Sequence, residues 1–172
     1  MNGNILYTAE SIRTRIKELS RQISKDYAGK DLVVVGVLKG AAIFLADLIR
    51  EIETPLKIDF VQLSSYGPDT ESSGQIRMKK EPDTDISGKH VLIVEDIVDT
   101  GISMVYLLGE LQKKGPADIR ICSLLDKRER RKVDVVVAYT GFTIPDKFVV
   151  GYGLDHDEKY RNLPYIAELG RA

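Results

Sequence analysis

Apolar residues follow two different spacings along the chain, one that predicts helices and one that predicts buried strands. Within residues 8–27, isoleucine and leucine recur every three or four positions, which predicts an amphipathic helix with Thr8 as its N-cap. The residues with this spacing are Ile12, Ile16, Leu19 and Ile23. The next apolar segment, DLVVVGVL at 31–38, is continuous and rich in β-branched residues. It therefore predicts a strand that is covered on both faces.

The same alternation of strand and helix continues along the rest of the chain. Helices are expected at 41–52, which Gly40 opens, and at 103–115, which Gly115 closes as a C′ glycine. This alternation predicts an α/β fold, a Rossmann-like open parallel β-sheet flanked by helices and wound by right-handed crossovers. The remaining strands are expected at 56–66, 89–96, 118–126, 133–142 and 147–154, and the tail 158–169 is read as short strand or turn.

One long polar segment interrupts this pattern. Residues 67–85, GPDTESSGQIRMKKEPDTD, are rich in Gly, Pro, Ser and Asp. A segment of this length inside a compact domain is generally a functional lid or is disordered, and composition alone leaves both open. We expect a mobile lid loop over 67–80 within a single domain that spans 1–172.

Polar residues follow four of the predicted strands. They stand in the motifs LKG (38–40), SSYG (64–67), EDIVDTG (95–101) and LLDKR (124–128). Ligands of open α/β sheets bind beyond the carboxyl ends of the strands. We therefore expect these four segments to converge on one rim of the sheet.

The composition is ordinary for a soluble globular domain, with 43% hydrophobic and 30% charged residues among 172. A net charge of -1 provides no overall positive field that would attract nucleic acid. No apolar run has the length needed to cross a bilayer, and the first residues lack the apolar core of a signal peptide. The single cysteine, Cys122, excludes an internal disulfide and lies in an apolar run typical of a buried thiol. We expect a cytoplasmic protein that binds neither nucleic acid nor membrane.

The stretch HVLIVEDIVDTGIS at 90–103 begins as a buried strand and ends as the start of a helix. The amides of Asp99 to Ser103 should be free donors, since the first amides of a helix have no partner within it. With the helix dipole they form a site for a phosphate monoester, to which the Thr100 and Ser103 hydroxyls can add hydrogen bonds. The absence of a GxxxxGK[ST] motif disfavours a P-loop nucleotidase.

Two acids stand just upstream of this loop, where a sugar attached to the phosphate would lie. Glu95 and Asp96 can accept hydrogen bonds from a ribose diol, favour a cationic sugar carbon, or bind Mg²⁺. The alternative is a strand end whose acids solvate the turn and cap the next helix. Residue types alone leave the two interpretations about equal.

The whole segment VLIVEDIVDTG resembles the phosphoribosyl pyrophosphate signature of the type I phosphoribosyltransferases. The rest of the chain resembles the hypoxanthine-guanine phosphoribosyltransferases in particular. The motifs occur in family order over nearly the full length: VLKGAAIFLADLIR, DFVQLSSYG, VEDIVDTG, LLDKRER, PDKFVVGYGLD and YRNLPYI. The resemblance implies the fold of that family, with a small hood region, and places Ser65 and Tyr66 in its mobile lid.

The resemblance also implies how phosphoribosyl pyrophosphate is bound, with Mg²⁺ as cofactor. Asp99 would be the general base or hydrogen-bond acceptor at purine N7. Lys39 and Gly40 would contact pyrophosphate through a peptide that is often cis, expected at Lys39–Gly40, and Arg161 would bind the same anion. Ile102 stands where some relatives carry lysine, so the phosphate would depend more on amides and hydroxyls. The residues expected around the sugar phosphate are Glu95, Asp96, Ile97, Asp99, Thr100, Gly101, Ile102 and Ser103, and those expected near the metal are Glu95, Asp96 and Asp155.

The purine site follows from the same resemblance. Lys127 would donate to the 6-oxo group, Phe148 would stack on the base, and backbone groups of Val149 would read its edge, near Asp155. Without the resemblance, Phe148 would be read as core and the basic run KRERRK at 127–132 as a solvated face. Lys39 and Arg161 would likewise be read as ordinary surface cations.

The implied activity is purine salvage, the transfer of 5-phosphoribosyl to hypoxanthine and guanine with release of pyrophosphate. Three alternatives remain at this point. They are a xanthine-guanine or other purine transferase, a nucleic-acid-binding regulator that retains the sugar-phosphate site, and a ligand sensor without turnover. The family also suggests a homodimer or homotetramer.

Overall fold

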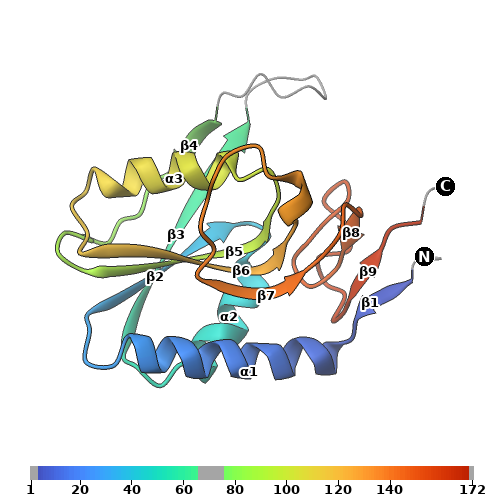
Figure 1. Cartoon of the computed structure of the whole chain (residues 1–172), viewed down its shortest axis with the longest axis horizontal. Coiled ribbons are helices and arrows are strands. Elements are labelled where there is room, and N and C mark those ends of the chain that lie inside the picture. Colours follow the sequence, from blue (N-terminus) through green and yellow to red (C-terminus); the bar gives the residue numbers. More distant parts are fainter. Residues whose placement is uncertain (1–3, 66–75, 171–172) are drawn as a thin grey trace.

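The structure is a computed structural model that describes residues 4–65 and 76–170, with the side chain of Ser65 left out. A six-stranded sheet in the order β4-β3-β2-β5-β6-β7 forms the centre of the molecule, and a three-stranded sheet, β1-β9-β8, lies beside it (Figure 1). The helices are α1 (Ala9–Asp26), α2 (Ala42–Glu51) and α3 (Ile102–Gln112), with a 3-10 turn at Arg128–Arg130. The strands are β1 (Ile5–Tyr7), β2 (Leu32–Leu38), β3 (Leu56–Ser65), β4 (Ile76–Lys80), β5 (His90–Val98), β6 (Asp118–Asp126), β7 (Tyr139–Thr143), β8 (Val149–Val150) and β9 (Ile166–Glu168).

The central sheet is parallel except at one edge. Strands β3, β2, β5, β6 and β7 run in one direction, and β4 pairs antiparallel with β3. Parallel strands need crossover connections, and here these carry α2 and α3. The predicted α/β class and its largely parallel sheet are confirmed. The strands lie where the apolar runs predicted them because such runs are buried on both faces.

Helix α1 packs by the predicted face. Thr8 is its N-cap, and the Thr8 hydroxyl accepts a hydrogen bond from the Ser11 amide at 3.2 Å. Its periodic apolar side chains pack with Phe44 and Leu48 of α2 in one core beneath the sheet (Figure 1). The buried members of α1 are Ile12, Ile16, Leu19 and Ile23.

Helix α3 covers the opposite face of the sheet. Its buried residues Met104, Leu107 and Leu111 pack on valines and isoleucines from β2 and β5. The two cores fix the sheet between helices on both sides, which leaves its strand ends as the open edge where ligands of such folds bind. Among the described residues, no helix has the length and apolarity to cross a membrane.

Two predicted strands were too long. The expected strand 133–142 is confined to Tyr139–Thr143, because residues 133–138 leave the sheet and cross over the start of α3, where Val133 and Val135 lie against Gly101. The expected strand 147–154 is only Val149–Val150, since the chain turns at Gly151 and Gly153, both with positive φ.

The lid expected over 67–80 stays a prediction. Its last five residues form β4, Ile76–Lys80, and residues 67–75 lie outside the described part of the chain. The tail, predicted as short strand or turn, contains β9. Together with β1 and β8 it forms the small sheet beside the central one (Figure 1), and the hood region stays a prediction.

Candidate active site

Three segments that are distant in sequence meet at the carboxyl edge of the central sheet. A Cβ atom on Gly40, in the turn after β2, would overlap the Asp96 carboxylate at the end of β5. A Cβ atom on Gly153 would overlap the Gly40 carbonyl oxygen. Glycine is therefore required at both positions by close approach of the neighbouring segment. The cis peptide bond of this turn joins Leu38 to Lys39, so the prediction of its place at Lys39–Gly40 was wrong by one residue.

The acidic pair of β5 is buried within this rim. Glu95 is 8% exposed, and its Oε1 accepts a hydrogen bond from the Asp96 amide at 3.0 Å. Asp96 in turn accepts from the Ile97 amide at 2.8 Å. Burial raises the pKa of Glu95 well above its usual range, and the neighbouring Asp96 charge raises it further. Burial also raises the pKa of Asp96, against the opposing effects of hydrogen bonds and the Arg161 charge.

This electrostatic state predicts that Glu95→Gln stabilises the metal-free protein at neutral pH. A folded-state pKa above the unfolded value means that stability is lost as pH rises between the two values. The neutral amide removes that loss, so the variant should melt higher at pH 7–8 and gain nothing below about pH 4, the ordinary range of glutamate. Each kcal/mol in the free energy of unfolding corresponds to about 2–4 °C in the melting temperature of a domain of this size. Thermal unfolding in the presence of a chelator, across this pH range, measures the effect.

The exposed Glu81 is the matched control. The Lys114 ammonium lowers the pKa of Glu81, so Glu81→Gln should leave the melting temperature unchanged or slightly lower. A Glu95→Gln gain that is equal at every pH would contradict the account of a buried, charge-repelled carboxylate.

The loop before α3 has the form that a phosphate site requires. Gly101 caps the helix with a φ of 85°, in the left-handed region, and its carbonyl accepts the Val105 amide at 3.0 Å. A Cβ atom there would lie 2.9 Å from the Val135 side chain, so both backbone and space favour glycine. The carbonyl oxygens of Val98 and Thr100 accept from the amides of Lys127 and Lys132, each at 3.0 Å, which orients the loop from its carbonyl side.

The basic run 127–132 is only in part a solvated face, because Lys127 is 8% exposed and the Arg131 side chain 18%. Arg131 donates to the carbonyl oxygens of Val98 and Asp99, at 3.0 and 2.6 Å, and is paired with Asp126 at 2.5 Å. Asp126 ends β6 and is 2% exposed, so the pair is largely removed from water. Asp126 and Arg131 were not predicted as supports of the loop, although Asp126 stands within the motif LLDKR and Arg131 lies three positions after it.

The predicted base Asp99 and the predicted purine-reading Lys127 are linked through two further side chains. Arg130 donates to Asp99 at 2.9 Å and to Asp146 at 3.0 Å. Asp146 also lies 3.5 Å from the Lys127 ammonium, which is largely buried. The Arg130 guanidinium lowers the pKa of Asp146, with a smaller effect of Lys127. The structure thus joins residues from three loops in one chain of charges.

The predicted base-stacking residue has a free face. Phe148 is 54% exposed, and His156 packs edge-on against it with ring centroids 5.4 Å apart. The Phe148 carbonyl accepts the Leu169 amide at 2.9 Å, and Val149 lies opposite Glu168 in the antiparallel pair. In this pattern the amide and carbonyl of Val149 point away from β9, toward the open edge of β8.

Arg161 and Asp155 already contact each other across the turn that follows β8. Arg161 donates to the Gly153 carbonyl at 2.7 Å and pairs with Asp155 at 2.8 Å, while the Glu158 amide donates to Asp155 at 2.9 Å. Among the residues that the structure describes, no three acidic, histidine or cysteine side chains form a group able to hold a metal. The expected set Glu95, Asp96 and Asp155 is therefore not gathered as a preformed cage.

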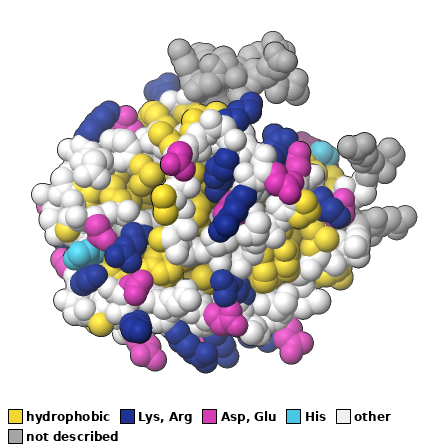
Figure 2. Space-filling view, viewed as in Figure 1, with side chains coloured by type: hydrophobic (Ala, Val, Ile, Leu, Met, Phe, Trp, Pro, Cys, Tyr) yellow, Lys and Arg dark blue, Asp and Glu magenta, His cyan; other side chains and the backbone are white. Residues whose placement is uncertain are grey.

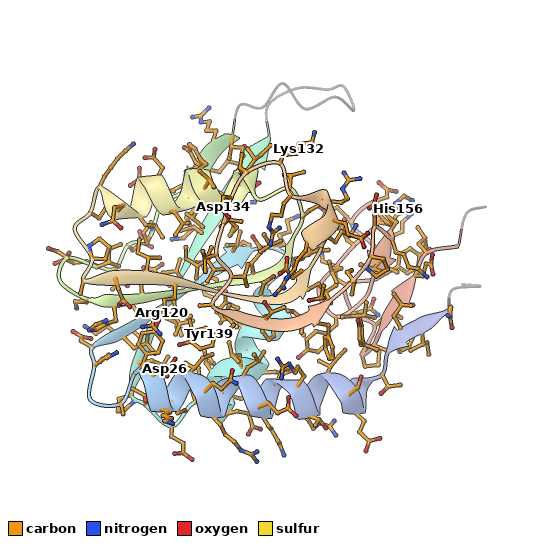
Figure 3. The ribbon with its side chains drawn as sticks, in the orientation of Figure 1. Asp26, Arg120, Lys132, Asp134, Tyr139 and His156 are labelled. Carbon is orange, nitrogen blue, oxygen red and sulfur yellow. The ribbon has the colours of Figure 1, made fainter. Side chains whose placement is uncertain are left out.

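Other candidate features lie elsewhere or outside the described residues. Tyr66 and the Ser65 side chain are among those not described. Cys122 is fully buried, and burial raises the pKa of its thiol, as expected of an unreactive core cysteine. The ion-paired group of Asp26, Arg120 and Tyr139 lies at the end of the sheet opposite to His156 (Figure 3). A cavity of about 450 Å³ lies between α1, α2 and residues 162–164, away from the phosphate loop.

A parallel sheet with a buried acidic pair, followed by a glycine-led helix start at its carboxyl edge, defines a class of proteins that bind sugar phosphates. The model of the phosphoribosyl transferase domain family matches residues 3–157, and the chain belongs to this family. The chain is 49% identical to the hypoxanthine-guanine phosphoribosyltransferase of Mycobacterium avium, over 96% of this chain and 85% of that protein. It is 50% identical to the hypoxanthine-guanine phosphoribosyltransferase of Staphylococcus aureus strain Mu50, over 96% of this chain and 92% of that protein.

Solved structures agree with the sequence comparison. A hypoxanthine phosphoribosyltransferase from Staphylococcus aureus superposes with a TM-score of 0.94 at 49% identity, covering 97% of this chain and 91% of that one. The enzyme from Trypanosoma cruzi in complex with the product IMP has a TM-score of 0.91 at 44% identity, covering 98% and 94%. Within the wider family, the chain belongs to the hypoxanthine-guanine phosphoribosyltransferases.

Proposed function

We propose that the protein transfers the 5-phosphoribosyl group of phosphoribosyl pyrophosphate to N9 of hypoxanthine or guanine, forming IMP or GMP and pyrophosphate in purine salvage. The observation that carries this proposal is the meeting of the buried pair Glu95–Asp96, the Gly101 loop and Lys127 around one edge of the sheet. Relatives that are about half identical over almost the whole chain are enzymes of this name.

The sugar phosphate is bound between the loop and the acidic pair. The 5′-phosphate takes the amides of Asp99 to Ser103, where the helix dipole favours an anion. The ribose hydroxyls donate to Glu95 and Asp96, which lie one step upstream on β5. As the bond from C1 to pyrophosphate lengthens, the same carboxylates stabilise the positive charge that develops on the sugar.

Mg²⁺ fits the chemistry of this site. It takes oxygen ligands and is commonly bound by one or two carboxylates together with substrate phosphates, so a cage of three protein acids is not needed. Glu95 and Asp96 are buried carboxyls with raised pKa values, a state that a nearby cation would relieve. When bound, the metal supplies positive charge that neutralises the leaving pyrophosphate.

The purine is bound on the other side of the loop. Phe148 offers its exposed face for stacking, and Val149 offers an outward amide and carbonyl to the edge of the base. Lys127 donates to the 6-oxo group. Asp99 either accepts the proton that the base loses or orients the base by accepting a hydrogen bond at N7. Arg130, which holds the Asp99 carboxylate at 2.9 Å, keeps that acceptor near the rim.

Lys127→Ala should weaken the use of hypoxanthine and guanine by about 1–3 kcal/mol, roughly 5- to 150-fold in kcat/KM, and relax the discrimination against adenine. The reason is that an ammonium donates to a 6-oxo group but is left unpaired by a 6-amino group. Competition between bases in one assay measures the preference. Lys132→Ala, which removes the same charge from an exposed position of the same segment, should leave the preference unchanged. If the Lys127→Ala variant keeps the base preference of the wild type, Lys127 has no part in base selection.

Steady-state kinetics with hypoxanthine, guanine, xanthine and adenine, with Mg²⁺ and detection of pyrophosphate, test the function itself. Release with hypoxanthine and guanine is expected, and release with xanthine as well as guanine would identify the xanthine-guanine transferase. A ligand sensor would bind the substrates but release no pyrophosphate. A nucleic-acid regulator would show salt-dependent binding. Figure 2 shows basic and acidic side chains interleaved over the face in view, which does not favour that last outcome.

The assembly and location remain inferences of the same proposal. We expect a cytoplasmic homodimer or homotetramer, whose mass can be read by light scattering. Small-molecule substrates are its only expected partners besides further copies of the chain.

A further inference from the structure

One carboxylate joins Lys39 and Arg161, the two cations that the family resemblance assigns to pyrophosphate. Glu158 Oε2 accepts a hydrogen bond from the Lys39 ammonium at 2.9 Å, and its Oε1 lies 3.4 Å from Arg161 Nη2. Lys39 belongs to the turn after β2, 119 positions away in sequence, whereas Arg161 is three positions ahead. Glu158 therefore links two separate parts of the rim, in addition to its local i,i+3 contact with Arg161.

The turn that carries this residue has an uncommon backbone. Asp157, Glu158 and Tyr160 have φ values of 52°, 59° and 75°, in the left-handed region that side chains other than glycine rarely adopt. The Glu158 amide donates to Asp155, and Arg161 pairs with the same carboxylate. Such conformations persist only where surrounding contacts maintain them, and they cluster at ligand sites. The turn is maintained by Asp155, which also pairs with Arg161, and by two backbone hydrogen bonds between His156 and Lys159, each at 3.1 Å.

The bridge is weak enough for an anion to displace it. The side chains of Lys39 and Glu158 are 59% and 64% exposed, and ion pairs of this exposure contribute little because water screens them. The Lys39 ammonium lowers the pKa of Glu158, so the carboxylate is charged at neutral pH. A pyrophosphate carries several negative charges and can bind the forked guanidinium of Arg161 through two oxygens, whereas Glu158 approaches Arg161 with one oxygen at 3.4 Å.

We propose that Glu158 is an internal competitor of pyrophosphate, a positioning residue whose carboxylate neutralises Lys39 and Arg161 whenever the pyrophosphate group is absent. Substrate binding displaces it from both cations, and its return favours departure of the product. The inference rests on the proposed function, with pyrophosphate bound at the two cations that the family resemblance assigns to it. It adds a residue that limits how tightly that anion is held.

Glu158→Gln tests the competition directly. The amide keeps the size of the side chain but removes the charge, so pyrophosphate should inhibit the forward reaction about two- to fivefold more tightly, the range of an exposed ion pair. The KM for phosphoribosyl pyrophosphate should fall in the same proportion, while kcat does not rise. A substitution that merely damaged the turn would weaken binding of the anion, so tighter inhibition distinguishes competition from a structural role.

Asp157→Asn is the matched control. It makes the same change of charge one position away, on a side chain that is 80% exposed and lies 3.5 Å from Lys159. Inhibition by pyrophosphate should not change in this variant. Equal tightening in both variants would show a general charge effect and overturn the inference, as would unchanged or weaker inhibition in Glu158→Gln beside normal turnover. A wild-type protein that releases no pyrophosphate with any purine would instead overturn the proposed function, and this inference with it.

Discussion

Asp99→Asn should lower kcat by about 10²–10⁴-fold while the protein remains folded. The carboxylate is the only member of the phosphate loop that the proposal uses to accept a proton or a hydrogen bond at purine N7, and an amide cannot take up the proton. The fold should survive because Asp99 is 40% exposed and its ion pair with Arg130 is not a core contact. Arg130 also retains its second partner, Asp146, in the variant.

The comparison that isolates chemistry from charge is Asp134→Asn. Asp134 is an exposed acid in the segment that crosses the start of α3, and its substitution removes the same charge from a place with no assigned role. Single-turnover rates, together with melting temperatures of both variants, separate loss of catalysis from loss of structure. Unchanged turnover in Asp99→Asn would exclude this residue from the mechanism, whatever the behaviour of the control.

Asp126→Ala should lower the free energy of unfolding by about 3–5 kcal/mol, the effect of removing one partner from a buried ion pair. Asp126 is 2% exposed and pairs with Arg131, whose side chain is 18% exposed. Without the carboxylate, the guanidinium of Arg131 would keep only its bonds to the carbonyl oxygens of Val98 and Asp99. Urea unfolding followed by circular dichroism measures the change.

A second partner of the same acid provides the control for this prediction. Arg128 also contacts Asp126, at 3.1 Å, but its side chain is 67% exposed, so Arg128→Ala should cost no more than about 1 kcal/mol. Because Arg131 orients the phosphate loop, Asp126→Ala should also bind IMP more weakly at a temperature where it is still folded. Equal destabilisation by the two substitutions would show that burial of the pair with Arg131 is not what matters.

Much of the fold was predictable because it depends on short-range patterns. Helix α1 and its Thr8 cap follow from a periodicity and a residue type that act within a few positions. One strand was predicted too long because a long-range contact overrides its apolar run. Residues 133–138 read as a strand, yet Val133 and Val135 cover the glycine that starts α3 and cannot remain in the sheet as well.

The candidate site was predictable in part for the same reason. The residues of the phosphate loop are consecutive, so their arrangement is set by a strand end and a helix start. The basic run 127–132 was read without family context as a solvated face, because nothing in its own sequence shows that Asp99, Asp126 and Asp146 lie around it. The place of the cis peptide was likewise missed by one residue.

The sequence by itself determined the class of fold, the order of its strands and helices, and the glycines and acids that come together at the rim. These features depend on neighbours in the chain and on which faces must be buried. Only the tertiary structure decided which charges are paired, how far Glu95 and Asp96 are withdrawn from water, and that Glu158 lies between Lys39 and Arg161. Electrostatic interactions act through space and depend on burial, so residues 119 positions apart can be partners without any mark of it in the sequence.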